Sequence, residues 1–276
     1  MDYMKLKVAL IIAFFILLAS LTAVVYDSTN GALTRLTVQR VTLSSPKIPL
    51  AFDQLNLVYF SDVHAHTLSD DYYQKVVDKI NACNPDFVVF GGDLIDEASY
   101  ATYSNTQRLA MIALLKSIQA PYGKFAILSE TDLAHATELT ALFMEAGFEV
   151  LNNKRIPIHV LGSPSISLIG WDASSSNSLL TEIQNGDYTL GFAHDPSFAD
   201  SLNGKGIDVL FSGKTHGGQV TLPLMGPLVY KDEIYQRGKY ALSKMDLFVS
   251  TGIGVSPLKA RWMTDPSFIL ITFNAP

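Results

Sequence analysis

Short apolar runs alternate along the chain with segments in which apolar residues recur at helical spacing. The runs predict strands over 36–43, 55–60, 87–90, 125–128, 156–160, 165–169, 188–192, 207–211, 247–249 and 268–273. The helical spacing predicts helices over 71–82, 109–118 and 139–146. The segments 174–178 and 223–238 are predicted to be irregular. Helix-separated strands followed by closely spaced strands indicate an α/β domain with layers and more than one sheet.

The longest apolar segment lies at the N-terminus. Residues Val8 to Tyr26 carry no charge, and at a rise of ~1.5 Å per residue they come close to the length that crosses a bilayer. Lys5 and Lys7 precede this run, and Asp27 follows it. By the positive-inside tendency, this asymmetry predicts a cytoplasmic N-terminus and the remaining chain outside the cell membrane.

A cleaved signal peptide is the alternative to a membrane anchor. The apolar core is longer than the ~7 to 15 residues usual in signal peptides, and no convincing cleavage site with small residues follows it. We therefore predict a single-pass anchor over 1–26, a linker over 27–35 and an extracytoplasmic soluble domain over 36–276.

Composition excludes several classes of function. The 276 residues are ample for a sizeable core. The net charge of -6, without any basic cluster, argues against a nucleic-acid partner. Cys83 is the single cysteine, which excludes an intramolecular disulfide and a cysteine-based zinc site. Its place at the end of an amphipathic segment predicts buried packing rather than a nucleophile.

Acidic residues and histidines follow five of the predicted strands. Asp62 and His64 follow one strand, Asp93 follows the next after two glycines, Asp132 follows a third, and His194 and His216 end two later strands. Carboxylates and imidazoles without thiolates suit Mn, Fe or Zn. Such a cation could polarise a phosphoryl oxygen and lower the pKa of bound water. Any one of these residues alone is better explained as a loop or capping residue, but their placement at successive strand ends indicates a metal site.

Two glycine motifs suggest nucleotide binding and are set aside. Gly213-Lys214-Thr215 resembles the tail of a phosphate-binding loop, but Asp208 stands where the first glycine of that motif is needed, and no helix signal follows. Gly252-Ile253-Gly254 resembles the start of a dinucleotide fingerprint, but Pro257 stands where its third glycine should be. The second segment is predicted to be a turn after a strand.

The acidic residues and histidines belong to longer segments with a fixed order. These segments are Ser61-Asp62-Val63-His64, Gly92-Asp93-Leu94-Ile95-Asp96, His194-Asp195-Pro196 and Thr215-His216-Gly217-Gly218-Gln219. Together they resemble the calcineurin-like metallophosphoesterases, and more narrowly the bacterial membrane-associated branch whose last motif is GHTHGGQ. The similarity covers residues 35–273. It implies a four-layer αββα sandwich with a two-metal site at the strand ends.

The resemblance also implies a role for each matching residue. Asp62, His64, Asp93 and His216 would hold the first metal ion, and Asp93 would bridge to the second. His194 would bind the second ion together with an Asn and a His from the two remaining motifs.

Three positions depart from the family pattern. Glu130 replaces the ligand Asn, Thr131 replaces the His that assists the leaving group, and Lys214 replaces the first His of the last motif. Thr131 cannot serve as a general acid near neutral pH. Asp96 and Asp132 match their motif positions, where a supporting role is expected.

The departures fall on the side of the second metal ion. Lysine is a poor ligand because a proton occupies its lone pair, and Glu130 is a stronger anion than Asn. We therefore hypothesise that the Lys214 ammonium takes the place of the second cation, paired with Glu130 and near Asp93. Loss of either partner would leave an unpaired charge. The hypothesis favours one bound ion over two, and it leaves open a contact between Lys214 and a substrate phosphate.

The prediction for function is metal-dependent hydrolysis of a phosphoester or pyrophosphate bond at the membrane or envelope. The substrate would be a phosphorylated small molecule or a lipid-linked molecule. The alternative is a catalytically impaired relative that binds a phosphorylated ligand or a protein partner. Lys214 and Thr131 favour the alternative.

Overall fold

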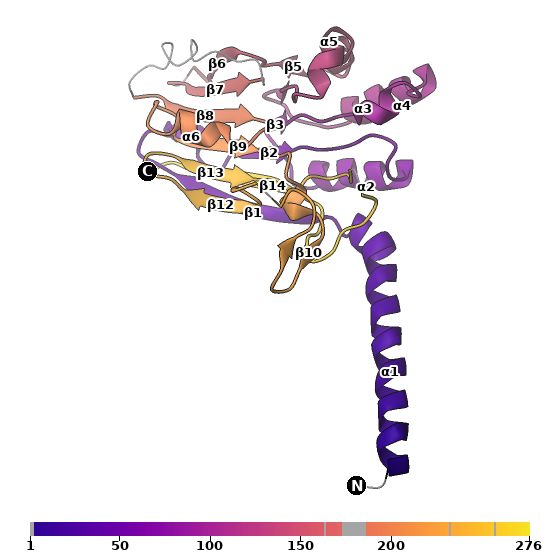
Figure 1. Ribbon diagram of the computed structural model, residues 1–276. Helices are drawn as coiled ribbons and strands as arrows, with labels where there is room; N and C mark the ends of the chain where they lie inside the picture. Colours follow the sequence, from indigo (N-terminus) through magenta and orange to yellow (C-terminus); the bar gives the residue numbers. More distant parts are fainter. Residues whose placement is uncertain (1–2, 163, 173–185, 232, 257) are drawn as a thin grey trace.

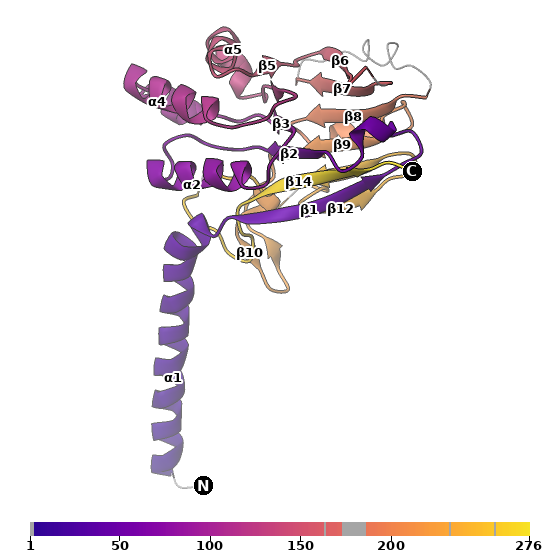
Figure 2. The same ribbon diagram turned by 180° about the vertical axis from the view of Figure 1, so that it is seen from behind.

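The computed structural model describes residues 3–162, 164–172, 186–231, 233–256 and 258–276. The domain is built from two stacked six-stranded sheets, and a long N-terminal helix projects from it (Figures 1 and 2). Helices cover the outer faces of both sheets, so the predicted four-layer αββα sandwich is confirmed.

The first sheet has the strand order β1-β14-β2-β3-β4-β5. Its strands are β1 (Thr37–Ser44), β14 (Ser267–Asn274), β2 (Asn56–Phe60), β3 (Phe87–Phe90), β4 (Lys124–Ala126) and β5 (Glu149–Val150). Strands β2 to β5 are parallel, and β14 runs antiparallel to β2. The helices of its outer layer are α2 (Asp70–Asn81), the short α3 (Glu97–Tyr100), α4 (Asn105–Lys116) and α5 (Ala136–Glu145).

The second sheet has the order β12-β13-β9-β8-β7-β6. Its strands are β12 (Gly238–Ala241), β13 (Asp246–Val249), β9 (Val209–Ser212), β8 (Tyr188–Ala193), β7 (Ile166–Trp171) and β6 (Lys154–Ile158). The four inner strands are parallel, and the two edge strands are antiparallel to their neighbours. The short helix α6 (Phe198–Leu202) packs on the outer face.

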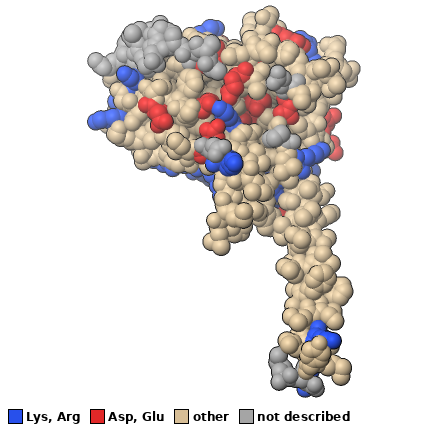
Figure 3. Space-filling model, viewed as in Figure 1, with Lys and Arg blue, Asp and Glu red and all other residues tan. Residues whose placement is uncertain are grey.

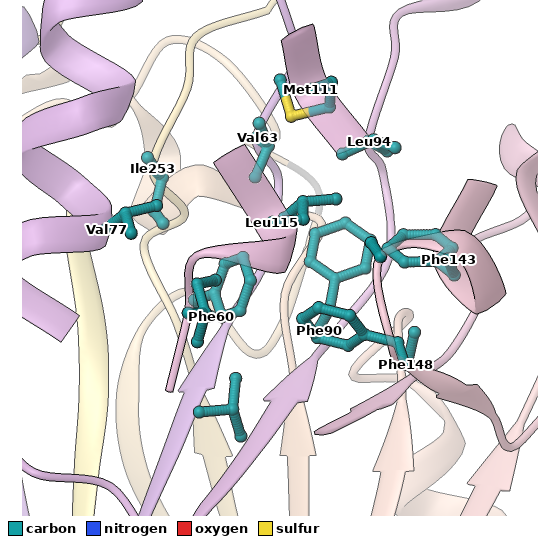
Figure 4. Packing of buried hydrophobic residues seen from close by; sticks show 14 of the residues in the cluster. Phe60, Val63, Val77, Phe90, Leu94, Met111, Leu115, Phe143, Phe148 and Ile253 are labelled. Carbon is teal, nitrogen blue, oxygen red and sulfur yellow. The ribbon is translucent and has the colours of Figure 1, made fainter. Parts of the chain in front are cut away.

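Successive side chains of β2 point to opposite faces of the sheet and pack in two different cores. Tyr59 points between the sheets, where its ring lies 5.5 Å from that of Phe211. Phe60 points to the other face, 5.2 Å from the ring of Phe90, in the core beneath α2, α4 and α5 (Figure 4). Because both faces of β2 are buried, its register is fixed, and so is the loop that follows it.

Most predicted elements are present, with boundaries that differ by a few residues. The short strands β5 and β12 were not predicted, and the segment 223–238 is not wholly irregular because it contains β11 (Gly226–Pro227), which pairs with β10 (Thr221–Leu222). Cys83 is half-buried rather than buried. The predicted loop at 174–178 lies outside the described residues.

The N-terminal helix α1 (Tyr3–Tyr26) continues as a helical stretch to Thr34. By length and composition alone, this stretch could cross a membrane. The predicted linker is therefore helical over most of its length: a π-helical turn spans Asp27–Gly31, and a 3-10 turn spans Ala32–Thr34. The division into anchor, linker and domain stays a prediction.

Candidate metal centre

Six loops meet where the inner strands of the two sheets end. They follow β2, β3 and β4 in the first sheet and β8, β9 and β13 in the second. Because β2, β3 and β4 are parallel to one another in the first sheet, as are β8, β9 and β13 in the second, the carboxyl ends of each set lie at one edge of their sheet. Acidic and basic side chains are interleaved on the surface over these strand ends (Figure 3).

The four residues predicted for the first metal ion come together at this edge. Asp62, His64, Asp93 and His216 each present one ligand atom, and these atoms all lie within 4.8 Å of one another. The Nε2 atoms of His64 and His216 are 2.9 Å apart, and Nε2 of His64 is 3.3 Å from Oδ2 of Asp93. Nε2 of His216 is 3.7 Å from Oδ1 of Asp62. Three different loops therefore direct two imidazoles and two carboxylates at one point.

His194 adjoins this cluster. Its Nε2 lies 3.6 Å from Oδ1 of Asp62, while its Nδ1 donates to the Gly91 carbonyl at 2.9 Å. In the same way, Nδ1 of His64 donates to Oδ1 of Asp96 at 2.6 Å. Both rings thus have one nitrogen held by a neighbouring oxygen and the other directed into the site, the arrangement usual for histidine ligands. Asp96 supports His64, as its motif position predicted.

Backbone strain concentrates at the same residues. The φ angles of Asp62, His64, Asp93, Lys214 and His216 are 54°, 44°, 64°, 70° and 49°. This left-handed region is unfavourable for residues other than glycine, and strain of this kind clusters at functional sites. Neighbouring side chains hold the strained loops: Val63 and Leu94 are buried in the helix-covered core (Figure 4).

Asp132 organises the loops after β3 and β4. Its carboxylate accepts hydrogen bonds from the backbone N–H groups of Asp93 at 2.7 Å, Leu94 at 3.2 Å and Ser129 at 2.9 Å. These bonds fix the turn that presents Asp93. The supporting role predicted for Asp132 is present in the structure.

The loop after β13 packs on Asp62 so closely that it requires glycine. A Cβ on Gly252 would lie 2.7 Å from Cβ of Asp62, and one on Gly254 would lie 2.2 Å from the carbonyl oxygen of Val63. The guanidinium of Arg261, fully buried, donates to the carbonyls of Thr251, Gly252 and Gly254. The Gly-x-Gly spacing was visible in the sequence and predicted a turn, but nothing there connected that turn to Asp62.

Burial and crowding shift the proton affinities of the cluster. Burial raises the pKa of Asp93 to about 7, although His64 and His194 oppose the shift. Burial lowers the pKa of His194, but the charges of Asp62, Glu130 and Asp93 outweigh it and raise the pKa to about 9. Burial lowers the pKa of His216 well below its usual value, and the charges of His64, Arg261 and His194 add to this shift.

The donor set fits a divalent cation. Burial raises the pKa of Asp93 to about 7, and the charges of Asp62 and Asp132 add to the shift, so ionised Asp93 is favoured at neutral pH only with a positive charge beside it. Because Nδ1 of His64 donates to Asp96, Nε2 of the neutral ring presents its lone pair to the site, where Nε2 of His216 lies 2.9 Å away. Imidazole and carboxylate ligands together suit Mn, Fe or Zn.

On the side where the resemblance expects a second ion, carboxylates surround the ammonium group of Lys214. Nζ of Lys214 makes a short contact with Oδ2 of Asp195 and lies 3.3 Å from Oε1 of Glu130 and 3.9 Å from Oε1 of Glu233. Pairing with Glu130 agrees with the sequence-based hypothesis, whereas no contact joins Lys214 to Asp93 among the described residues. Asp195 and Glu233 were not predicted as partners, although Asp195 is the neighbour of His194 in its motif.

These charges hold Lys214 protonated. Burial lowers the pKa of Lys214, but the hydrogen bond with Asp195 and the charge of Glu130 outweigh it and raise the pKa. Burial raises the pKa of Asp195, but the hydrogen bond from Lys214 outweighs it and lowers the pKa. With three carboxylates around it, the ammonium would have to leave one of them to contact a substrate phosphate.

Thr131 lies between the two sides of the site. Its hydroxyl is 2.8 Å from that of Ser129 and donates to Oδ1 of Asp93 at 3.3 Å. It occupies the position at which the resemblance expects a histidine, and it orients the Asp93 carboxylate.

Two cavities border the cluster. One, of about 630 Å³, is lined by His64, Asp93, Thr131, Tyr230 and Lys259 among others. The second, of about 300 Å³, lies on the Lys214 side, between Glu130, Asp195 and Trp171. The larger cavity gives a ligand access to the proposed metal ligands.

Comparison with known proteins identifies relatives along most of the chain. No protein-family model matches. A Bacillus subtilis protein named uncharacterized metallophosphoesterase YkuE is 29% identical over 248 residues, which cover 85% of this chain and 84% of that protein. The uncharacterized protein YpbG of the same organism is 24% identical and covers 99% of this chain and 100% of its own length. UDP-2,3-diacylglucosamine pyrophosphatase LpxG of Chlamydia trachomatis is 25% identical over 239 residues, covering 68% of this chain and 71% of that protein.

Solved structures match at low sequence identity. A dimetal phosphatase from Danio rerio has a TM-score of 0.48 at 10% identity, covering 74% of this chain and 90% of that chain. Phosphopantetheinyl hydrolase from Mycobacterium tuberculosis has a TM-score of 0.46 at 9% identity, covering 78% of this chain and 98% of that chain. Among the sequence relatives, YkuE is named a metallophosphoesterase and LpxG a pyrophosphatase.

Proposed function

We propose that this protein is a membrane-anchored, metal-dependent hydrolase of a phosphoester or pyrophosphate bond. The observation that carries the proposal is the convergence of Asp62, His64, Asp93 and His216 within 4.8 Å, on strained loops at the strand ends. Strain and buried like charges at one point have a cost that a bound cation would offset. The relatives named metallophosphoesterases support the same class of activity.

Each residue has a definite task in this proposal. Asp62, His64, Asp93 and His216 hold the cation, which when bound supplies Lewis-acid polarisation of a phosphoryl oxygen. Asp96 fixes the ring of His64 so that Nε2 faces the site. Neutral His216 keeps a lone pair for the ion, because its pKa is lowered by burial.

The Lys214 ammonium takes over part of the charge of a second cation. It balances Glu130 and Asp195, which would otherwise repel each other and the Asp62 and Asp93 carboxylates. A lysine stays in place without a metal supply but contributes only one positive charge. The proposal therefore expects one bound ion and a slower reaction than a two-ion site would give.

The proposed substrate carries its phosphate on a lipid or another envelope molecule. The apolar helix α1 is long enough to hold the domain at a bilayer, with the domain on the outer side, as Lys5 and Lys7 indicate. The chlamydial relative is named as a pyrophosphatase of a diacylated sugar nucleotide. Both observations favour a lipid-linked phosphate over a freely soluble one.

A second candidate is a binding protein without turnover. Two observations favour it. Thr131 stands where the resemblance expects the histidine that assists the leaving group, and the Lys214 ammonium is already paired with Asp195. The cleft would then bind a phosphorylated ligand or a protein partner without cleaving it.

Hydrolysis tests the choice between these functions. The full-length protein in detergent, supplied with Mn, Fe or Zn, is expected to hydrolyse a generic aryl phosphate, and Asp93→Asn is expected to abolish the activity. Asp78→Asn, at an exposed position on α2, serves as the control and should leave the rate unchanged. Metal binding without turnover in the unaltered protein would support the second candidate instead.

A further inference from the structure

The β10–β11 hairpin exposes apolar side chains at its tip. Leu224 is fully exposed and Met225 is 75% exposed; Leu228 beside them is more than half exposed. No charged residue occurs between His216 and Lys231. An apolar surface of this kind on a projecting hairpin has a cost in water unless another apolar phase covers it.

The base of the hairpin is part of the candidate metal centre. The hairpin begins just after His216, and the Tyr230 ring beyond it stacks on the His216 ring at 5.5 Å and 4°. A Cβ on Gly218 would lie 2.6 Å from Cβ of Pro227, so the two arms of the hairpin meet closely there. The tip is thus carried by a rigid connection rather than by a free loop.

One segment joins this base to the end of the N-terminal helix. The backbone N–H of Arg261 donates to the Ser28 carbonyl at 2.8 Å. The next residue, Trp262, donates to the Gln219 carbonyl at 3.0 Å and accepts from the N–H of Thr221 at 3.0 Å. Helix end and hairpin therefore share the two-residue segment Arg261-Trp262.

The direction of the helix relative to the domain is also set by contacts. Arg35 pairs with Asp27 at 2.5 Å and with Asp265 at 3.2 Å, and Ala32 and Leu33 are buried. In both ribbon views the hairpin projects from the domain in the direction in which α1 leaves it (Figures 1 and 2). In Figure 3 the projecting hairpin shows neither acidic nor basic surface.

We propose that the β10–β11 hairpin is a second membrane contact, whose tip at Leu224 and Met225 enters the outer surface of the bilayer that α1 crosses. This inference rests on the proposed membrane anchor. A lipid surface rather than a protein covers the hairpin tip, because the tip and the apolar helix α1 point the same way from one rigid base. Exposed Lys231 follows Tyr230 in the sequence, and exposed Lys259 lines the larger cavity together with Tyr230; both ammonium groups suit anionic headgroups.

The contact has a consequence for the site. Tyr230 and Lys259 line the larger cavity, and Tyr230 belongs to the segment that follows the hairpin. A hairpin seated in the bilayer holds the mouth of this cavity at the headgroup level. A phosphate borne on a lipid would then reach the metal ligands without leaving the membrane, whereas a soluble phosphate would gain nothing from the arrangement.

Depth measurements on the full chain test the proposal. In a Cys83→Ala background, an environment-sensitive fluorophore is attached to Met225→Cys, to Leu17→Cys within α1, and to Lys244→Cys. Lys244 is exposed in the turn before β13, at the opposite end of the strands from the site. The labelled proteins are reconstituted into vesicles of phosphatidylethanolamine and phosphatidylglycerol. Quenching by a lipid-borne nitroxide and by aqueous iodide is then compared.

The expected result is lipid-phase quenching and a blue-shifted emission at positions 17 and 225, with iodide quenching only at position 244. Quenching by lipid at position 17 together with iodide quenching at 225 would overturn the hairpin contact and leave the anchor intact. Protection of position 225 from both quenchers would indicate a protein contact and would also overturn it. Iodide quenching at position 17 would refute the membrane anchor itself. The hydrolysis assay tests the catalytic part of the proposed function separately.

Discussion

Nζ of Lys214 lies 3.3 Å from Oε1 of Glu130, so the two residues that stand in place of expected metal ligands form an ion pair. Independent loss of two ligands would not produce opposite charges in contact. Asp195 and Glu233 complete a ring of carboxylates around the ammonium. The altered side of the site is thus a built charge cluster, with one positive group among three negative ones.

Removal of the ammonium should destabilise the protein. Lys214→Met leaves Glu130 and Asp195 without a counter-charge in a half-buried site. We expect a loss of roughly 1–2 kcal/mol in the free energy of unfolding, between the values for exposed and buried pairs. Denaturant unfolding of the full chain in detergent measures it.

A matched control separates this effect from the loss of any lysine. Lys239 pairs with Asp246 at 2.7 Å, but its side chain is 52% exposed. Lys239→Met should cost no more than about 0.5 kcal/mol. Equal losses for the two variants would contradict the view that the Lys214 cluster is structural.

The sequence predicted some pairs of neighbouring residues in this site and missed others. The meeting of Asp62 with Asp93 followed from a simple rule, since neighbouring parallel strands bring their carboxyl ends to one edge. The meeting of Asp62 with His216, which follow strands of different sheets, followed from the family resemblance. The ion pair of Lys214 with Glu130 followed from the family pattern. The role of Asp195 did not follow, because it depends on which way a loop side chain points after β8.

Other parts of the structure gave no local signal. An arginine is usually exposed, so nothing in the sequence indicates that Arg261 is buried with its guanidinium on backbone carbonyls. Strand β5 has only two residues, and β12, with the sequence GKYA, has no apolar run; pairing with their neighbours stabilises both. Left-handed backbone at Asp62 and Asp93 comes from the packing of several loops, which no single segment encodes.

Asp96 should affect metal binding through His64. Asp96→Asn weakens the 2.6 Å contact that holds Nδ1 of His64 and leaves the ring free to turn. We expect metal affinity to fall roughly 10–100-fold with little change in stability. Isothermal titration of the metal-free protein with Mn or Zn measures this, and Asp78→Asn should bind as the unaltered protein does. Unchanged affinity in Asp96→Asn would contradict a role of Asp96 in metal binding through His64.

Gly252 should be required for the position of Asp62. In Gly252→Ala the new methyl group meets Cβ of Asp62 at 2.7 Å, and the φ of +67° adds left-handed strain of about 1–2 kcal/mol. Gly238→Ala is the matched control, since Gly238 has a φ of +80° with no neighbour within 4 Å of the added methyl. Both variants should lose stability, but only Gly252→Ala should lose metal affinity. Equal metal affinity in the two variants would contradict a role of Gly252 in positioning Asp62.

The metal-free protein should lose stability as the pH rises. His194 has a pKa raised to about 9, so its favourable contribution is complete below about pH 6.5 and is lost as the pH rises through 9. Asp93 has a pKa raised to about 7, so its ionisation above its unfolded value of 3.8 also favours the unfolded state up to pH 7. These two signs point the same way, whereas the lowered pKa of His216 increases stability as the pH rises through its unfolded value near 6.5, so the net loss of stability is expected above about pH 7.

A bound cation should reverse this trend. It requires neutral His64 and His216 and ionised Asp93, so its affinity should increase with pH and its binding should release protons. Thermal unfolding from about pH 5 to about pH 9, with and without Mn, should show a stabilisation by metal that grows with pH. A stabilisation independent of pH would contradict the assignment of these residues to the metal centre.

The number of ions bound per chain tests the central claim most directly. Elemental analysis of the purified full-length protein, equilibrated with Mn, Fe or Zn, should find about one ion per chain. The triple variant Lys214→His, Glu130→Asn and Thr131→His should bind about two ions per chain, because its first two changes restore the ligands that the resemblance expects. Two tightly bound ions in the unaltered protein would contradict the proposal that the Lys214 ammonium stands in for the second.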